Sequence, residues 1–326
     1  MKPVRFDNIS VTLRRKQYFY IVPPLTFSPL FEEFEASGST IFYLLIFTLM
    51  EPIKIAILDM YDGYANEGMR CIKAITERFV NQNGMNATYQ IFDVRQKCEV
   101  PDLGFDIYIS SGGPGNPQPA GELWEKPFFL FLDQLWQHNR QPHHPRKKHL
   151  FLICHSFQMA CLHWGVGLVC KRRSTSFGIF PMTKTHFGQN EPFFKPLLDP
   201  FYAVDSRDFQ VIEPNHQHLE RIGAKILCIE KERPHVAHLE RAIMAVRFSR
   251  EVFGTQFHPE ADAEGMLRHF QKDEKREGII KNHGEEKYND MVAHLQDPDK
   301  IMLTEASIIP TFLCKAAEQL MGVELV

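Results

Sequence analysis

A cysteine stands at a point in the sequence where a nucleophile can act. Cys154 directly follows the apolar run Phe151–Ile153, and the chain then passes into a helical pattern. A buried strand that turns sharply into a helix exposes the turn residue at the end of the strand, among the free amides of the helix N-terminus. Cys154 is therefore a candidate nucleophile. The alternative is that Cys154 is a small residue of the hydrophobic core, where most intracellular cysteines lie.

A histidine and a glutamate further along the chain supply the groups that such a nucleophile needs. In an extended segment the side chains of His258 and Glu260, which are two residues apart, lie on the same face. Glu260 can accept a hydrogen bond from one ring nitrogen while the other nitrogen points outward. A cysteine nucleophile requires a base, and the base requires an orienting group. Without Cys154, His258 and Glu260 would indicate only a surface pair with no catalytic role.

A glycine-rich stretch, Ser110–Pro117, follows a predicted strand and includes Gly112 and Gly113. Glycines leave the backbone uncovered, so that amide groups can point at a ligand or at a developing anion. The alternative is an ordinary Gly/Pro turn. A phosphate-binding loop is excluded, because no Gly-Lys-Ser/Thr follows.

The elements that must position these residues alternate between strands and helices. The pattern predicts strands at 53–58, 89–94 and 105–109 and helices at 69–81 and 124–137, with a further helix running from Cys154 to about His163. This alternation indicates parallel βαβ units, in which ligands bind beyond the carboxyl ends of the strands. After Gly167 the chain becomes more β-like, with strands expected at 168–170, 177–182, 201–204, 209–212, 225–229 and 243–248.

Composition excludes several other classes of protein. The chain has 326 residues, 44% of them hydrophobic and 24% charged, as in a soluble globular protein, and its net charge of -3 argues against a nucleic-acid partner. Seven dispersed cysteines suggest reduced thiols and a cytoplasmic location. The longest apolar run, Ile41–Met50, is too short for a membrane helix. The histidines follow no recognisable metal-binding pattern, so no metal and no cofactor are predicted.

The two ends of the chain differ from its middle. Residues 1–49 are interrupted by prolines and show little periodicity, so we expect a poorly ordered or non-native N-terminal extension. Beyond Gly265, segments 265–275, 284–295 and 307–321 are predicted as helices with one apolar face, which includes Ile308, Phe312, Leu313 and Leu320. That face either packs on the domain or makes a contact with a partner, such as a second copy in a homodimer.

Taken together, these motifs resemble the class I glutamine amidotransferases. The resemblance covers residues 52–270 and rests on Ser111–Gly115, on Cys154 with Gln158 four residues on, and on the specific stretch Gly254–Glu260. Pro214–His216 also stands where this family often carries a Ser-His segment. Leu152 and Ser156 depart from the glycines that the family usually has on either side of its nucleophile.

The resemblance implies a role for each matching residue. Cys154 is expected to attack the side-chain amide of glutamine, or of another γ-glutamyl amide, giving a γ-glutamyl thioester and ammonia. His258 would act as the base and Glu260 would orient it. The Gly112-Gly113 stretch and the backbone of His155 would form the oxyanion hole, and Gln158 would lie near the bound glutamine. The ammonia acceptor would be a separate synthetase.

The resemblance also implies an open, mostly parallel α/β sheet flanked by helices, with a small additional β segment and a helical C-terminal extension. We expect the amidotransferase-like domain at 50–270 and the extension at 271–326. Two other functions remain open at this point. One is an acyltransferase of the homoserine O-succinyltransferase type, and the other is a non-enzymatic binding protein that keeps the fold.

Overall fold

The computed structural model describes residues 11–15, 18–20 and 51–326, apart from 65, 83–84, 145, 237, 298–299, 323 and 326. Most of the predicted N-terminal extension, 1–49, thus lies outside the described residues. Its two described segments, β1 (Val11–Arg15) and β2 (Tyr18–Tyr20), pair with each other, and β1 also pairs with β12 (Glu324–Leu325).

The main sheet has nine strands in the order β4-β3-β5-β6-β11-β10-β9-β7-β8. Its first five strands are parallel, and the predicted strands upstream of Cys154 all lie there; the bounds are β3 (Ile53–Asp59), β4 (Ala87–Asp93), β5 (Ile107–Ser110), β6 (His149–Ile153) and β11 (Val252–Thr255). The remaining strands extend the sheet with antiparallel pairings; they are β7 (Leu168–Lys184), β8 (Phe201–Ile212), β9 (Lys225–Glu230) and β10 (Ile243–Arg247).

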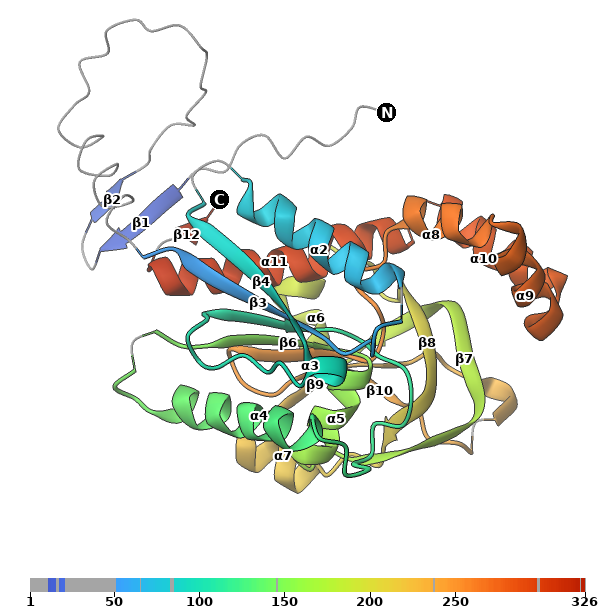
Figure 1. Ribbon diagram of the computed structural model, residues 1–326, viewed down its shortest axis with the longest axis horizontal. Helices are drawn as coiled ribbons and strands as arrows, with labels where there is room; N and C mark the ends of the chain where they lie inside the picture. The colour runs from blue at the N-terminus through green and yellow to red at the C-terminus, as the bar shows by residue number, and fades with distance from the viewer. Residues whose placement is uncertain are drawn as a thin grey trace, which may run out of the picture.

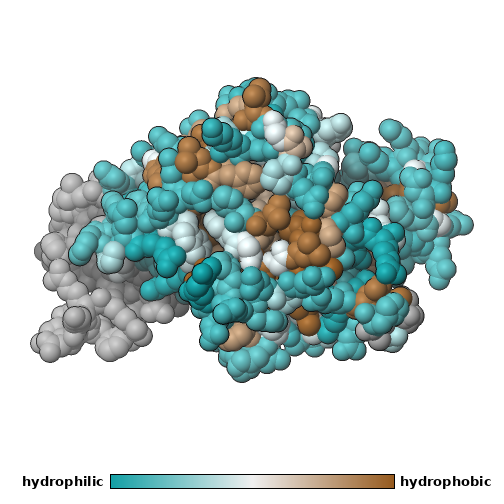
Figure 2. All heavy atoms as spheres, turned by 90° about the horizontal axis from the view of Figure 1, so that it is seen from below, coloured by the Kyte–Doolittle hydropathy of each residue, from teal (hydrophilic) through white to brown (hydrophobic). Residues whose placement is uncertain are grey.

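Helices cover both faces of the sheet, which confirms the predicted fold class (Figure 1). One face is covered by α2 (Glu67–Val80) and α11 (Ile301–Met321), whose apolar residues share a core with β3, β5 and β6. The other is covered by α4 (Glu125–Arg140), α5 (His155–His163) and α7 (His216–Ile222). Figure 2 shows the molecule from the side of α4 and α7, where an apolar patch is surrounded by hydrophilic side chains.

The C-terminal helices pack back on the chain that carries them. α8 (Ala263–Phe270), α9 (Asp273–His283) and α10 (Glu285–Gln296) form a third apolar cluster with β7 and β8. In α11, Ile308, Phe312 and Leu313 are buried against the sheet. The apolar face that suggested a contact between two copies is therefore already covered within one chain. None of the described helices is long and apolar enough to cross a membrane.

Three sequence expectations differ from the structure in where an element is continuous or interrupted. The predicted strand pairs 168–170 with 177–182, and 201–204 with 209–212, are each one strand, β7 and β8. Their registers shift between Lys171 and Ser176, where polar residues interrupt the apolar pattern. The helix expected at 265–275 is in fact two, because α8 ends at Phe270 and α9 starts anew at Asp273. Short helices complete the chain: α3 (Val94–Lys97), α6 (His186–Gln189), and single 3-10 turns at Pro192–Phe194 and Pro234–Val236.

Candidate functional site

Cys154 lies at a strained turn between a buried strand and a helix. Every residue of β6 is buried, and α5 begins at His155. Between them Cys154 has φ 47° and ψ -98°, a conformation that costs a residue with a Cβ on the order of 1–3 kcal/mol. The packing of β6 and α5 enforces this turn, which puts the thiol at the carboxyl end of the parallel strands. This is the place that the sequence predicted for a nucleophile.

Leu152 and Ser156, the residues two positions before and after Cys154, are both accommodated by their surroundings. Ser156 is fully buried, accepts a hydrogen bond of 2.9 Å from the Ser110 hydroxyl, and donates one to the Ser111 carbonyl. Leu152 lies beside Gly254 of the adjacent strand β11, where a Cβ would be only 3.3 Å from the Leu152 Cβ. A glycine on the neighbouring strand thus offsets the leucine, and Ser156 ties α5 to the glycine-rich loop.

His258 and Glu260 form a hydrogen-bonded pair just beyond β11. The Nδ1 of His258 lies 2.8 Å from a carboxylate oxygen of Glu260, and the His258 backbone amide donates to the Val204 carbonyl of β8 at 2.8 Å. Glu260 is only 1% exposed, and its other carboxylate oxygen has no partner among the described residues. The backbone of His258 is therefore held by β8, and its ring is oriented by the Glu260 carboxylate.

The electrostatics of the site favour a protonated His258. Burial lowers the pKa of its imidazole, but the negative charge of Glu260, the Cys154 thiolate and hydrogen bonding to both side chains outweigh that effect. The pKa of His258 is consequently raised well above its ordinary value near 6.5. An imidazolium of this kind stabilises a thiolate next to it.

Gly112 and Gly113 need to be glycines, because other atoms lie too close to their backbone for a Cβ to fit. A Cβ on Gly112 would lie 2.9 Å from Cε1 of His258 and 3.5 Å from the Cβ of Cys154, so the glycine backbone lies directly against both side chains. A Cβ on Gly113 would clash with the Met60 carbonyl oxygen. The loop is held by Ser111, whose amide donates to the Leu58 carbonyl at 3.0 Å and whose hydroxyl accepts from the Met60 amide at 2.9 Å. Side chains at these two positions would fill or distort the site.

The side chains of His155 and Gln158 point into the protein. The His155 ring is 2% exposed, and burial, helped by the charge of Arg95, lowers its pKa to about 3, so the ring is neutral. The Gln158 amide donates to the Phe209 carbonyl at 3.0 Å and to the side-chain oxygen of Gln256 at 2.9 Å. Gln256 in turn points its amide nitrogen at the Cys154 sulfur, 3.6 Å away. The His155 ring is thus buried, and the Gln158 side chain is linked to the thiol through Gln256.

Two residues that the sequence analysis did not single out lie at the thiol. Besides Gln256, Tyr61 has its hydroxyl close to the backbone of Gly112 and Gly68 and near Glu260. Burial raises the pKa of the Tyr61 phenol well above its usual value, and the charges of Glu260 and Cys154 raise it further, so the phenol stays protonated. Gln256 could have been predicted from the sequence, because it belongs to the same short motif as His258. Tyr61 belongs to no sequence motif that would have indicated its position at the site.

Pro214–His216 does not lie at the site. Asn215 caps α7 by accepting from the His218 amide at 3.1 Å, and His216 is exposed. The chain segment that approaches the nucleophile is β8, whose Ser206 carbonyl lies 3.8 Å from the Cys154 sulfur. In the described part of the chain, no three His, Cys, Asp or Glu side chains are grouped so as to hold a metal ion.

Comparison with known proteins gives this geometry a family context. The family model for class I glutamine amidotransferases matches residues 56–275, which include Cys154, His258 and Glu260. The chain belongs to this family. The sequence resemblance to class I amidotransferases is thereby confirmed, whereas the role of each residue is a separate question.

Solved structures show the same fold at low sequence identity. A glutamine amidotransferase from Thermotoga maritima superimposes with a TM-score of 0.59 at 14% identity, over 82% of this chain and 100% of its own. One from Methylobacillus flagellatus gives 0.53 at 14% identity, over 81% and 94% of the two chains. No curated protein sequence matches the chain. At these identities the two structures support the fold of this class I amidotransferase and nothing finer.

Proposed function

We propose that this class I amidotransferase is a cysteine glutaminase, which hydrolyses the side-chain amide of glutamine to glutamate and ammonia. The observation that carries the proposal is the arrangement of Cys154 at its strained turn, with the bonded pair of His258 and Glu260 and the bare backbone of Gly112 against it. This arrangement supplies a nucleophile, an oriented base and uncovered amides around one point.

The proposed reaction has two halves. The thiolate of Cys154 attacks the amide carbon, and the C–N bond breaks as His258 gives its proton to the leaving ammonia. Water, deprotonated by His258, then attacks the thioester and releases glutamate. Glu260 holds Nδ1 through both halves, so that Nε2 exchanges the proton.

In both halves, negative charge develops on the former carbonyl oxygen. The backbone amides of Gly113 and His155 are the proposed donors, and each such donor is worth about 3 kcal/mol in other acyl-transfer sites. The bonds from Ser156 to Ser110 and Ser111 would keep these two amides in register, since they join α5 to the glycine-rich loop. Gln158 acts in this scheme through Gln256 and not on the substrate. Ammonia is proposed to pass to a separate synthetase.

A glutamine-derived chloroketone tests the proposal. The purified protein is incubated with the reagent, the adduct is located by peptide mass spectrometry, and ammonia release from glutamine is measured in parallel. We expect an adduct on Cys154, competition by glutamine, and loss of both labelling and ammonia release in Cys154→Ala. The exposed thiol of Cys98 provides the matched control, because Cys98→Ala should change neither. Absence of both adduct and ammonia in the wild type would contradict the proposal.

A further inference from the structure

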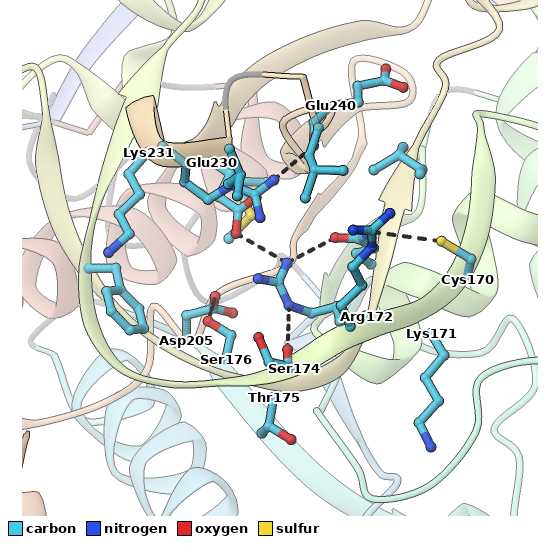
Figure 3. A pocket seen from close by; sticks show the side chains of 18 of the residues that line it. Cys170, Lys171, Arg172, Ser174, Thr175, Ser176, Asp205, Glu230, Lys231 and Glu240 are labelled. Atoms are coloured by element: carbon cyan, nitrogen blue, oxygen red, sulfur yellow. Dashed lines mark hydrogen bonds and ion pairs between the residues drawn. The ribbon is translucent and has the colours of Figure 1, made fainter. Parts of the chain in front are cut away.

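A cavity of about 600 Å³ lies between the bulged part of β7, strands β8 and β10, and the segment after β9 (Figure 3). None of the residues placed around Cys154 above lines it. Its volume is in the range of cavities that hold metabolites. The lining includes charged side chains, among them Arg172 and Arg233, and apolar ones, among them Leu239 and Met244.

Positive charge exceeds negative charge in this cavity. Its lining contains five cationic and three anionic side chains. One carboxylate, Glu230, is shared by three guanidinium groups, those of Arg172 at 3.1 Å, Arg207 at 3.2 Å and Arg233 at 3.1 Å. Asp205 is the only other carboxylate that pairs with any of these three within the described residues. Three buried or half-buried cations are thus offset by two anions, an arrangement that an anionic ligand would relieve.

Hydrogen-bond donors are also left over. The Nε of Arg233 is buried and has no partner in the described part of the chain. Lys171 and Arg173, both in the lining, make no ion pair with a described residue, and Ser174 stands beside them, whereas the Thr175 hydroxyl already donates to Asp208. Burial and the nearby charge of Arg207 lower the pKa of Arg172, which is the effect expected where cations crowd together. Guanidinium forks with spare donors suit carboxylate and phosphate groups.

We propose that this cavity binds a small organic anion. Its carboxylate or phosphate group would lie at Arg172 and Arg233, and its non-polar part would lie against Leu239 and Met244. The site is distinct from the glutamine site proposed above, so the ligand is either a second substrate or an effector.

Arg207 does not line the cavity, but it shares the lining carboxylate Glu230 with Arg172 and Arg233, and hydrogen bonds connect it to the nucleophile. Arg207 donates to the Phe209 carbonyl at 3.4 Å, and the same carbonyl accepts from Gln158 at 3.0 Å. From Gln158 the contacts continue through Gln256 to the Cys154 sulfur. A ligand that draws on the guanidinium cluster is therefore expected to change the reactivity of Cys154. This part of the inference rests on the proposed role of Cys154 as the nucleophile.

Calorimetric titration with inorganic phosphate and with succinate, at ionic strength matched with sodium chloride, tests the binding. We expect saturable binding of at least one anion, weakened tenfold or more in both Arg172→Gln and Arg233→Gln. Arg268→Gln, an exposed arginine outside the cavity, is the matched control and should bind as the wild type does. Phosphate and succinate separate a phosphate ester from a carboxylic acid as the ligand class.

Circular dichroism of each variant, recorded without ligand, shows whether it folds. If Arg233→Gln does not fold, Arg172→Gln alone tests the binding, because it leaves Glu230 with two guanidinium partners. No saturable binding of either anion, or equal binding in a folded Arg172→Gln or Arg233→Gln, would overturn the proposal.

The rate at which iodoacetamide alkylates Cys154 tests the connection. With saturating anion we expect this rate to change at least twofold in the wild type and to stay constant in Arg233→Gln. An unchanged rate at full occupancy would disprove the connection while the binding site stands. Because alkylation needs no turnover of glutamine, the result is independent of whether the protein is a glutaminase.

Discussion

Glu260 governs the charge state of its neighbour at the scale of single residues. Its carboxylate is almost fully buried, and it is the main favourable cause of the raised pKa of His258. Burial alone would push that pKa down and give a neutral imidazole. The thiolate of Cys154 would then lose the cation beside it. The reactivity of the thiol should therefore depend on a residue that does not touch the substrate.

Glu260→Gln tests this dependence. The neutral amide removes the main charge that raises the pKa of His258, so the imidazole should lose its proton more readily and the cation beside Cys154 should be lost. We expect slower alkylation of Cys154 at pH 7 in the variant than in the wild type, with ammonia release reduced on the order of 10²–10⁴-fold.

Stopped-flow alkylation and an ammonia assay measure the two effects of this substitution. Glu264→Gln, a substitution of an exposed glutamate on α8, provides the comparison and should behave as the wild type does. An alkylation rate at pH 7 that is unchanged in Glu260→Gln would show that Glu260 does not act through the charge of His258.

At the scale of elements, strand β6 begins with a buried histidine whose titration affects stability. His149 opens the strand, is 2% exposed, and has an Nε2 without a partner among the described residues. Burial, which is the largest effect, lowers its pKa from 6.5 to about 4. The unfolded chain therefore binds more protons than the folded one between these values. As a result, the free energy of unfolding should fall as the pH drops from 6.5 toward 4.

His149→Gln tests this element. Between pH 6.5 and pH 5 the wild type should lose about 1.5 kcal/mol more stability than the variant, because only the wild type has to protonate a buried imidazole on unfolding. Urea denaturation at the two pH values measures the difference. Equal losses in both proteins would show that His149 is not responsible.

The sequence predicted the elements that carry periodic patterns better than those defined by contacts. Strand β6 and the turn at Cys154 were predictable, because the apolar run and the helical pattern meet at one residue. The continuity of β7 was not, because the polar residues of its bulge conceal a strand that pairing with β8 extends. Gln158 was assigned to the substrate by resemblance, yet its amide binds Gln256, a contact between segments far apart in the chain.

At the scale of the whole molecule, α11 belongs to the same core as the strand that ends at the candidate nucleophile. The Phe312 ring lies 5.2 Å from that of Phe151 in β6. A division of the chain near residue 270, expected from the sequence, would make this helix an appendage that can be lost separately. The shared core leads us to propose the opposite, that α11 and the sheet unfold together.

Phe312→Ala distinguishes the two cases. Truncating this buried ring should lower the free energy of unfolding by about 3–5 kcal/mol. The three tryptophans, Trp124, Trp136 and Trp164, pack on the opposite face of the sheet, so their fluorescence reports on a region that the substitution does not touch. If the molecule unfolds as one unit, the urea midpoint seen by tryptophan fluorescence shifts as far as the midpoint seen by circular dichroism.

Met302→Ala, at a position of α11 that is 46% exposed, should change the free energy of unfolding by no more than about 0.5 kcal/mol. A tryptophan midpoint that stays constant in Phe312→Ala would instead show that α11 unfolds on its own, and it would support the division of the chain near residue 270.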